Sequence, residues 1–164
     1  MSQQIVIDSV TFAREAGSLQ GEMPIADLTR VLDLLVDSAG YLEYRAEGKL
    51  GSRNRSQLLL QVDGVLSLCC QRCLEEVKYP LAMRSLLEFV ANEDDLTQDE
   101  IEDDSRDFLV EQKELDIAAL IEDEIILFLP SAPHHENCVM PEAGQKLAKV
   151  LPFSSLTGLK DKAQ

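Results

Sequence analysis

The sequence contains no tryptophan and only two histidines, and these shortages exclude several classes of catalytic site. The histidines, His134 and His135, are adjacent, so two separate histidine-based centres are not available. No G-x-S-x-G, P-loop, G-x-G-x-x-G or H-E-x-x-H pattern occurs. The sequence therefore gives no indication of the familiar hydrolase, nucleotide-binding or zinc-protease sites.

Long apolar runs are also missing. The run IILFLP is far shorter than the roughly 18 to 20 residues that span a membrane. The N-terminal stretch MSQQIVIDSVTFAREAGS has no basic start and no apolar stretch typical of a signal peptide. We therefore expect a cytoplasmic protein without a membrane partner. Its four cysteines are then expected to be reduced, bound to metal or catalytic, and not to form structural disulfides.

Basic residues are scarce, with 15 Lys and Arg against 30 Asp and Glu, for a net charge of −15. Phosphate contacts need lysine and arginine, so DNA and broad, nonspecific nucleic-acid binding are not expected. About half of the excess lies in residues 92–107, which carry nine acids and one arginine. This segment is typical of a flexible, solvated loop, and the alternative is an acidic arm that attracts a basic partner.

Hydrophobic periodicity predicts an α+β fold, with a mainly antiparallel β-sheet that is either open or barrel-like. A first helix is predicted over residues 23–40, where apolar residues recur at helical spacing, and a second over 116–129, between Asp116 and Pro130. Strands are predicted between them, with turns at residues 48–56 and at Asp63-Gly64. The whole chain, 1–164, is predicted as one domain with an extended C-terminal tail over 139–164.

Cysteine supplies the main chemical pattern. Cys70 and Cys73 form a C-x-x-C, and His135 and Cys138 form an H-x-x-C. These residue types suit a tetrahedral structural zinc site, provided that the fold brings together two pairs separated by about sixty residues. The alternatives are buried free thiols and a redox pair, although the extended pattern after Cys73 does not suit a thioredoxin-like site. Cys69 is expected to point to the opposite face.

Two groups of charged residues are further candidates. Glu122, Asp123 and Glu124 suggest acid–base or magnesium chemistry, but consecutive helical residues point in different directions. A solvated face is expected for Glu122 and Asp123, whereas Glu124 is expected beside the apolar face. The second group consists of basic residues at the first hairpin turn and in the C-x-x-C, which could contact RNA or simply be solvated: Arg45, Lys49, Arg53, Arg55 and Arg72.

Three stretches, CQRCLEEVKYPL, DIAALIEDEIILFLPSAPHHENC and LPFSSLTGLK, closely resemble the YceD family of large ribosomal RNA subunit accumulation proteins. The resemblance implies a non-enzymatic factor in the synthesis, processing or stability of 23S ribosomal RNA. Its expected partners are this RNA or its precursor, a large-subunit ribosomal protein, or both. Cys70, Cys73, Cys138 and the helix Glu122–Pro130 match family positions, and no catalytic residue is implied.

Two other functions remain as alternatives. The first is a zinc- or thiol-dependent enzyme that uses the CQRC motif. The second is a protein-binding module unrelated to ribosomes.

Overall fold

The structure, a computed structural model, describes residues 5–103 and 107–140 and has an α+β fold. Its centre is a six-stranded sheet in the order β2-β4-β5-β6-β7, with β3 paired to β5 outside this path. A separate two-stranded sheet joins β1 (Val6–Ile7) to β8 (Leu115–Asp116). The strands of the main sheet are β2 (Ser18–Pro24), β3 (Leu35–Asp37), β4 (Tyr41–Leu50), β5 (Ser56–Cys69), β6 (Glu76–Val90) and β7 (Asp107–Val110).

The main sheet is open and mixed, so the barrel-like alternative is wrong. Its neighbouring strands are antiparallel except for β6 and β7, which are parallel. β2 and β7 lie at the two ends of the strand order and do not pair with each other. The sheet therefore keeps two edges instead of closing.

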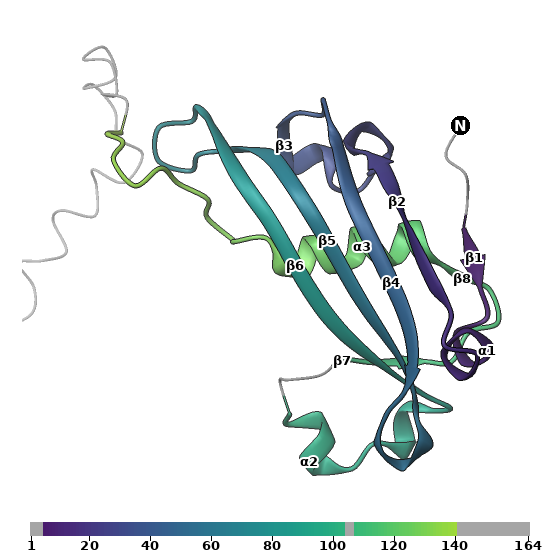
Figure 1. The fold of residues 1–164 in the computed structure, drawn as a ribbon. Coiled ribbons are helices and arrows are strands. Elements are labelled where there is room, and N and C mark those ends of the chain that lie inside the picture. The colour runs from purple at the N-terminus through teal and green to yellow at the C-terminus, as the bar shows by residue number, and fades with distance from the viewer. Residues whose placement is uncertain (1–4, 104–106, 141–164) are drawn as a thin grey trace, which may run out of the picture.

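The predicted helix near 116–129 is confirmed as α3 (Ile117–Phe128), which crosses one face of the sheet (Figure 1). It begins at Asp116, whose carboxylate accepts hydrogen bonds from the N–H groups of Ala118 at 2.9 Å and Ala119 at 3.4 Å. Pro130 follows its end. The core lies between α3 and the sheet, where fully buried leucine or isoleucine side chains contribute about 1.5–3 kcal/mol each. The helix supplies Ile117, Leu120, Ile121 and Ile125 to this core.

The helix predicted over residues 23–40 is wrong. The segment instead forms two 3-10 turns, η1 (Ile25–Asp27) and η2 (Leu32–Leu34), followed by β3. The physical reason is the pairing of Leu35 with Leu68 of β5, which draws the segment into β3. Before β3, Ile25, Leu28 and Val31 are buried at intervals of three residues. That is the period of a 3-10 helix and not of an α-helix. The N-terminal helix is instead the short α1 (Ser9–Arg14), whose first turn is capped by Asp8.

The turn predicted at Asp63-Gly64 is also wrong, because β5 continues through both residues. Gly64 serves close packing here: a Cβ atom at this position would lie 2.3 Å from the Leu42 side chain. The turn predicted over 48–56 is confirmed by η3 (Ser52–Asn54) between β4 and β5. β6 tolerates Pro80 because Val65 and Pro80 are not a hydrogen-bonded pair of the ladder, so the proline nitrogen faces away from β5.

The acidic segment 92–107 contains η4 (Glu93–Asp95) and α2 (Gln98–Ile101) before residues 104–106, which lie outside the description. Most of the predicted C-terminal tail, 141–164, is also outside it. Within the described residues, no helix is long and apolar enough to cross a membrane.

Candidate metal centre

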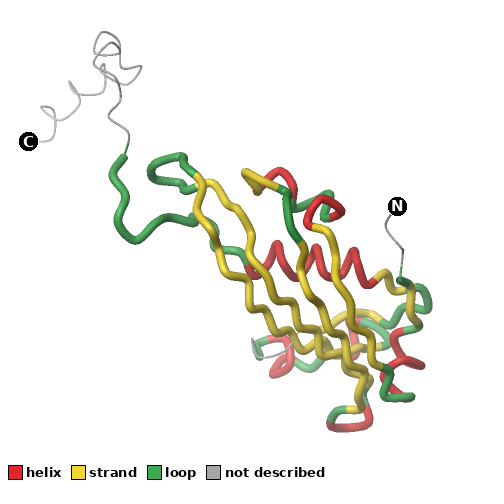
Figure 2. The backbone as a smooth tube through the Cα atoms, turned by 45° about the horizontal axis from the view of Figure 1, so that its top comes forward, coloured by secondary structure: helices red, strands yellow, loops and turns green. Residues whose placement is uncertain are grey.

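Two segments that are distant in the sequence meet at one end of the sheet. The connection from β5 to β6 carries Cys70 and Cys73, and the segment after α3 carries His135 and Cys138. Figures 1 and 2 both show this second segment leaving α3 and approaching the β5–β6 connection. One ligand atom from each of the four residues lies within 4.8 Å of every other. The structure thus brings together the set that sequence spacing predicted, whereas Cys69 stays outside it.

Main-chain hydrogen bonds shape the first of these segments into a tight loop. The Cys70 N–H donates to the Glu75 carbonyl at 2.8 Å, and the Leu74 N–H donates to the Cys70 carbonyl at 2.9 Å. Leu74 has a φ of 64°, a left-handed conformation that is uncommon for leucine. A further bond, from the Gln71 N–H to the Pro133 carbonyl at 2.8 Å, joins the two segments. The loop therefore holds its two sulfur atoms close together and toward the segment after α3.

The spacing of the donor atoms fits a tetrahedral zinc ion. Zn–S bonds of about 2.3 Å and Zn–N bonds of about 2.0 Å in a tetrahedron place neighbouring donors about 3.5–3.8 Å apart. The Cys70 and Cys138 sulfurs are 3.6 Å apart, and the Cys73 sulfur lies 3.4 Å from Nδ1 of His135. Three sulfurs and one imidazole are also a donor set that zinc prefers. The cluster could hold a metal such as zinc.

The orientation of His135 supports this use of its ring. Its Nε2 lies 2.9 Å from the Glu76 carbonyl. A proton on Nε2 donates to that carbonyl and leaves the lone pair of Nδ1 directed at the sulfurs. Metal-ligating histidines commonly donate their second ring N–H in this way, which fixes tautomer and orientation. His134 instead has Nδ1 within 3.1 Å of the Ala132 carbonyl and is not part of the cluster.

The thiols themselves have unequal pKa values. Burial alone would raise the pKa of Cys70, but N–H groups of Cys73, Arg72 and His135 point at its sulfur and lower the pKa to about 5. The Glu75 N–H acts to lower the pKa of Cys73, but burial and the sulfurs of Cys70 and Cys138 outweigh it and raise that pKa. One thiolate is therefore stabilised by the main chain. A bound cation would favour the thiolate forms of all three cysteines in the cluster, Cys70, Cys73 and Cys138.

The five basic residues proposed for RNA contact do not form one surface. Arg72 lies in the metal-centre loop, where it donates to the Cys138 carbonyl at 3.3 Å. Arg53 and Arg55 lie at the β4–β5 turn, at the opposite end of β5. Arg45 lies on β4 and is paired with Glu47 at 2.6 Å, and Lys49 is exposed on the same strand.

The turn arginines already have carboxylate partners. Arg55 donates to Glu100 at 2.8 Å and to Glu88 at 3.2 Å, and Arg53 lies 3.3 Å from Glu100. Glu88 is only 1% exposed and also accepts from Gln57 at 2.7 Å. Hydrogen bonds from Thr97 and Arg55 lower the pKa of Glu100 to about 2. The acidic segment therefore neutralises part of the basic turn, which no local sequence signal indicated.

The acidic helix residues lie elsewhere and have separate roles. Glu122 is 7% exposed and accepts from the Arg30 N–H at 3.4 Å, so the solvated face expected for it is wrong. Asp123 is half-exposed and forms an ion pair with the Arg30 side chain. Glu124 is 8% exposed, as its position beside the apolar face predicted, and is hydrogen-bonded to Ser85. Burial raises the pKa of the Glu124 carboxyl.

Comparison with known proteins gave one family. Searches of curated proteins and of solved structures gave no significant match. The sequence model of the family described as large ribosomal RNA subunit accumulation protein YceD matches residues 58–160. This range covers more than half of the chain and contains all four residues of the metal-centre cluster. The chain accordingly belongs to the YceD family.

Proposed function

We propose that this protein is a non-enzymatic factor in the accumulation of 23S ribosomal RNA. It acts as an adaptor that binds precursor RNA, a basic large-subunit ribosomal protein, or both. Membership of the YceD family is the observation that carries this proposal. The strong negative charge favours a lysine- and arginine-rich protein as the first contact, because opposite fields accelerate encounter.

The metal centre fits this role as a structural clip that holds zinc. Four protein donors, Cys70, Cys73, His135 and Cys138, complete a tetrahedron and leave no open position for substrate or water. A bound zinc supplies positive charge that favours the thiolate forms. The chain's own contribution is to hold the segment after α3 against the β5–β6 connection, through Gln71 and the His135 ring.

The β4–β5 turn is the proposed RNA contact. Arg53 and Arg55 offer guanidinium groups there, and Lys49 lies nearby on β4. Because Glu100 already pairs with both arginines, an RNA phosphate has to replace this carboxylate. Contact at the turn is therefore expected to be selective and weak, and sensitive to salt.

Thiol chemistry is the second candidate function. It is favoured by the lowered pKa of Cys70, about 5, since a thiolate at neutral pH is a nucleophile. The two candidates differ in metal content. Stoichiometric zinc that protects the thiols from alkylation supports the clip, and a metal-free protein with a rapidly alkylated Cys70 supports thiol chemistry.

The test of the proposed function is deletion of the gene, followed by measurement of precursor and mature 23S RNA. We expect mature RNA to fall, and plasmids that encode the wild type or Cys69→Ser to restore it. Cys138→Ser is expected to restore it only in part. Unchanged precursor and mature RNA after deletion would contradict the proposal and favour a binding module unrelated to ribosomes.

A further inference from the structure

β2 is one of the open main-chain edges of the main sheet among the described residues. β2 ends the strand order of the main sheet and pairs with β4 on one side only. The ladder with β4 shows which main-chain N–H and C=O groups of β2 are already hydrogen-bonded. The Gly48 N–H donates to the Gly17 carbonyl at 2.8 Å, and the Ile25 N–H donates to the Gly40 carbonyl at 3.1 Å. Hydrogen-bonded pairs alternate in an antiparallel ladder, so odd-numbered residues of β2 bond to β4.

The even-numbered residues of β2 therefore direct their main-chain groups away from the sheet. Ser18, Gln20 and Glu22 each present one N–H and one C=O to the open side. Among the described residues, none of these groups has a main-chain partner. Pro24 falls in the same series, where its missing N–H costs no bond to β4. It also marks the end of the available edge.

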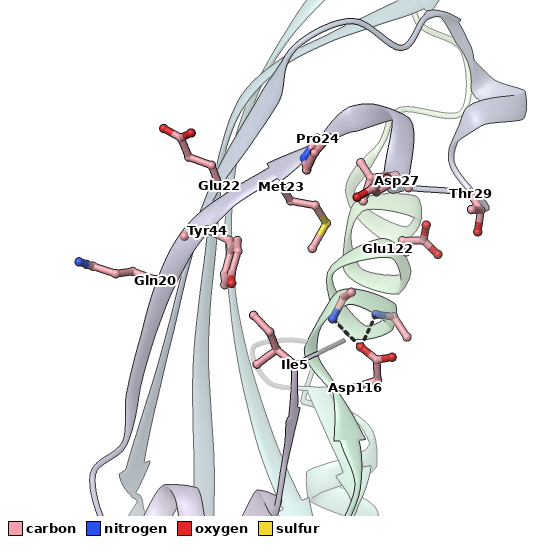
Figure 3. Close-up of a pocket in the computed structure, with 14 residues that line it drawn as sticks. Ile5, Gln20, Glu22, Met23, Pro24, Asp27, Thr29, Tyr44, Asp116 and Glu122 are labelled. Atoms are coloured by element: carbon pink, nitrogen blue, oxygen red, sulfur yellow. Dashed lines mark hydrogen bonds between the residues drawn. The ribbon is translucent and has the colours of Figure 1, made fainter. Parts of the chain in front are cut away.

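A cavity of about 490 Å³ lies along this edge, between β2 and the first turns of α3 (Figure 3). Ile5, Met23 and Tyr44 point into the space between the strand and the helix, whereas Gln20 and Glu22 point to the other side of β2. An added strand would lie about 4.8 Å from β2 and would direct alternate side chains into the cavity. The cavity thus offers apolar contacts next to unpaired main chain.

The charge of this site selects the occupant. Four acidic residues contribute to the lining of the cavity, and no Lys, Arg or His does: Glu22, Asp27, Asp116 and Glu122. The Glu22 side chain itself points to the other side of β2. Within the described part of the chain, the side-chain carboxylates of Glu22 and Asp27 make no hydrogen bond or ion pair. A second copy of this chain, also with a net charge of −15, would be repelled. An extended peptide rich in lysine or arginine is attracted, and its aliphatic stems can pack on Met23 and Tyr44.

From these observations we infer that the β2 edge binds an extended cationic segment of a partner protein by strand addition. Main-chain hydrogen bonds supply affinity, and the acidic, partly apolar cavity supplies selectivity. This inference rests on the proposed function, in which a basic large-subunit ribosomal protein is a partner, and it adds where such a partner binds. It is nevertheless tested with purified protein and peptide, so its failure would leave the ribosomal RNA phenotype intact.

The probe is a fluorescent peptide of about ten residues with alternating Lys and Thr, which suits an extended conformation. Binding is measured by anisotropy and mapped by amide shifts in NMR. A peptide with proline in place of each threonine is the control, because it cannot complete a ladder. We expect shifts in residues 18–24 with the first peptide only.

Two variants separate the main-chain and charge contributions. Gln20→Pro removes an outward N–H without breaking a bond to β4, and is expected to weaken binding about tenfold or more. Asp27→Asn keeps the edge and is expected to weaken binding about threefold to tenfold. Asp33→Asn, in the neighbouring η2 and outside this cavity, is the matched charge control and is expected to bind like the wild type.

Several results would overturn the inference. They are absence of peptide binding up to about 1 mM, equal binding by the wild type, Gln20→Pro and Asp27→Asn, and shifts that map to the β4–β5 turn. A single-stranded RNA oligonucleotide that shifts residues 18–24 in place of the peptide would also overturn it. A dimer of the free protein that is joined through β2 would also overturn the inference, because the edge would then already be occupied. Amide shifts in β2 that follow removal of residues 2–4, with no peptide added, would overturn it for the same reason.

Discussion

Loss of metal is expected to release one segment while the core of the protein stays folded. Residues 130–140 are held to the β5–β6 connection by three hydrogen bonds besides the cluster: Gln71 N–H to Pro133, Arg72 to Cys138, and the His135 ring to Glu76. At about 1 kcal/mol each, they retain the segment only weakly without metal. None of the four candidate ligands belongs to the main hydrophobic cluster. The sheet and α3 should therefore survive chelation.

The size of the effect follows from ligand linkage. Free zinc at about a hundred times its dissociation constant stabilises the folded state by about 2.7 kcal/mol, which corresponds to roughly 5–11 °C in Tm for a chain of this size. The same free energy predicts an increase of about a hundredfold in amide exchange within the released segment. Zinc is measured by mass spectrometry on protein purified without a histidine tag. Exchange and Tm are then measured before and after chelation.

Cys138→Ser tests the cluster directly, and Cys69→Ser is its matched control because Cys69 is a neighbouring thiol outside the cluster. We expect Cys138→Ser to lose zinc and to reproduce the effect of the chelator. Cys69→Ser should retain about one zinc per chain, as expected for a single four-donor site. Equal zinc content and equal Tm in the two variants would refute the assignment of the ligands.

Three further predictions concern the fold. At a pH above the raised pKa of the Glu124 carboxyl, Glu124→Gln should have a higher Tm than the wild type, because a carboxyl with a raised pKa destabilises the fold only when it is ionised. Below pH 4.5 the variant should show no gain in Tm, and a similar gain at both pH values would contradict this prediction. The contact of α2 with the β4–β5 turn should be lost as the pH falls from 4.5 through about 2, where Glu100 becomes protonated. In NMR spectra at pH 7, Glu100→Gln should already show this contact loosened, whereas its control Asp99→Asn should show the contact intact. Ile121→Ala should lower the free energy of unfolding by about 2–5 kcal/mol in urea titrations, and Leu127→Ala, at a site 77% exposed, should change it little.

Local patterns in the sequence predicted α3, and they identified the four Cys and His side chains that the structure brings together. Asp116 and Pro130 mark the limits of the helix, and the spacing of Ile117, Leu120 and Ile121 gives its buried face. Cysteine and histidine are few, so their pairing into one cluster could be proposed without knowledge of the fold. Which ring nitrogen of His135 faces the sulfurs depends on the Glu76 carbonyl, about sixty residues away, and no local pattern contains that information.

Other errors have the same physical origin in distant contacts. Residues 23–40 carry apolar side chains that fit either a helical or a 3-10 period. The choice follows from the pairing of Leu35 with Leu68 of β5, which draws the segment into β3. Most described residues of the acidic segment are exposed, but the sequence does not show that Glu100 meets Arg55. The open edge of β2 is a property of strand order, which is likewise set by tertiary packing.

The most direct test of the proposed function is in-cell crosslinking of the tagged protein during growth, with bound RNA sequenced and bound proteins identified. The account predicts that large-subunit precursor RNA, a basic large-subunit ribosomal protein, or both are enriched over a control strain. Enrichment should fall when the cluster is broken by Cys138→Ser and persist in Cys69→Ser. Recovery of neither large-subunit RNA nor any large-subunit protein would contradict the account.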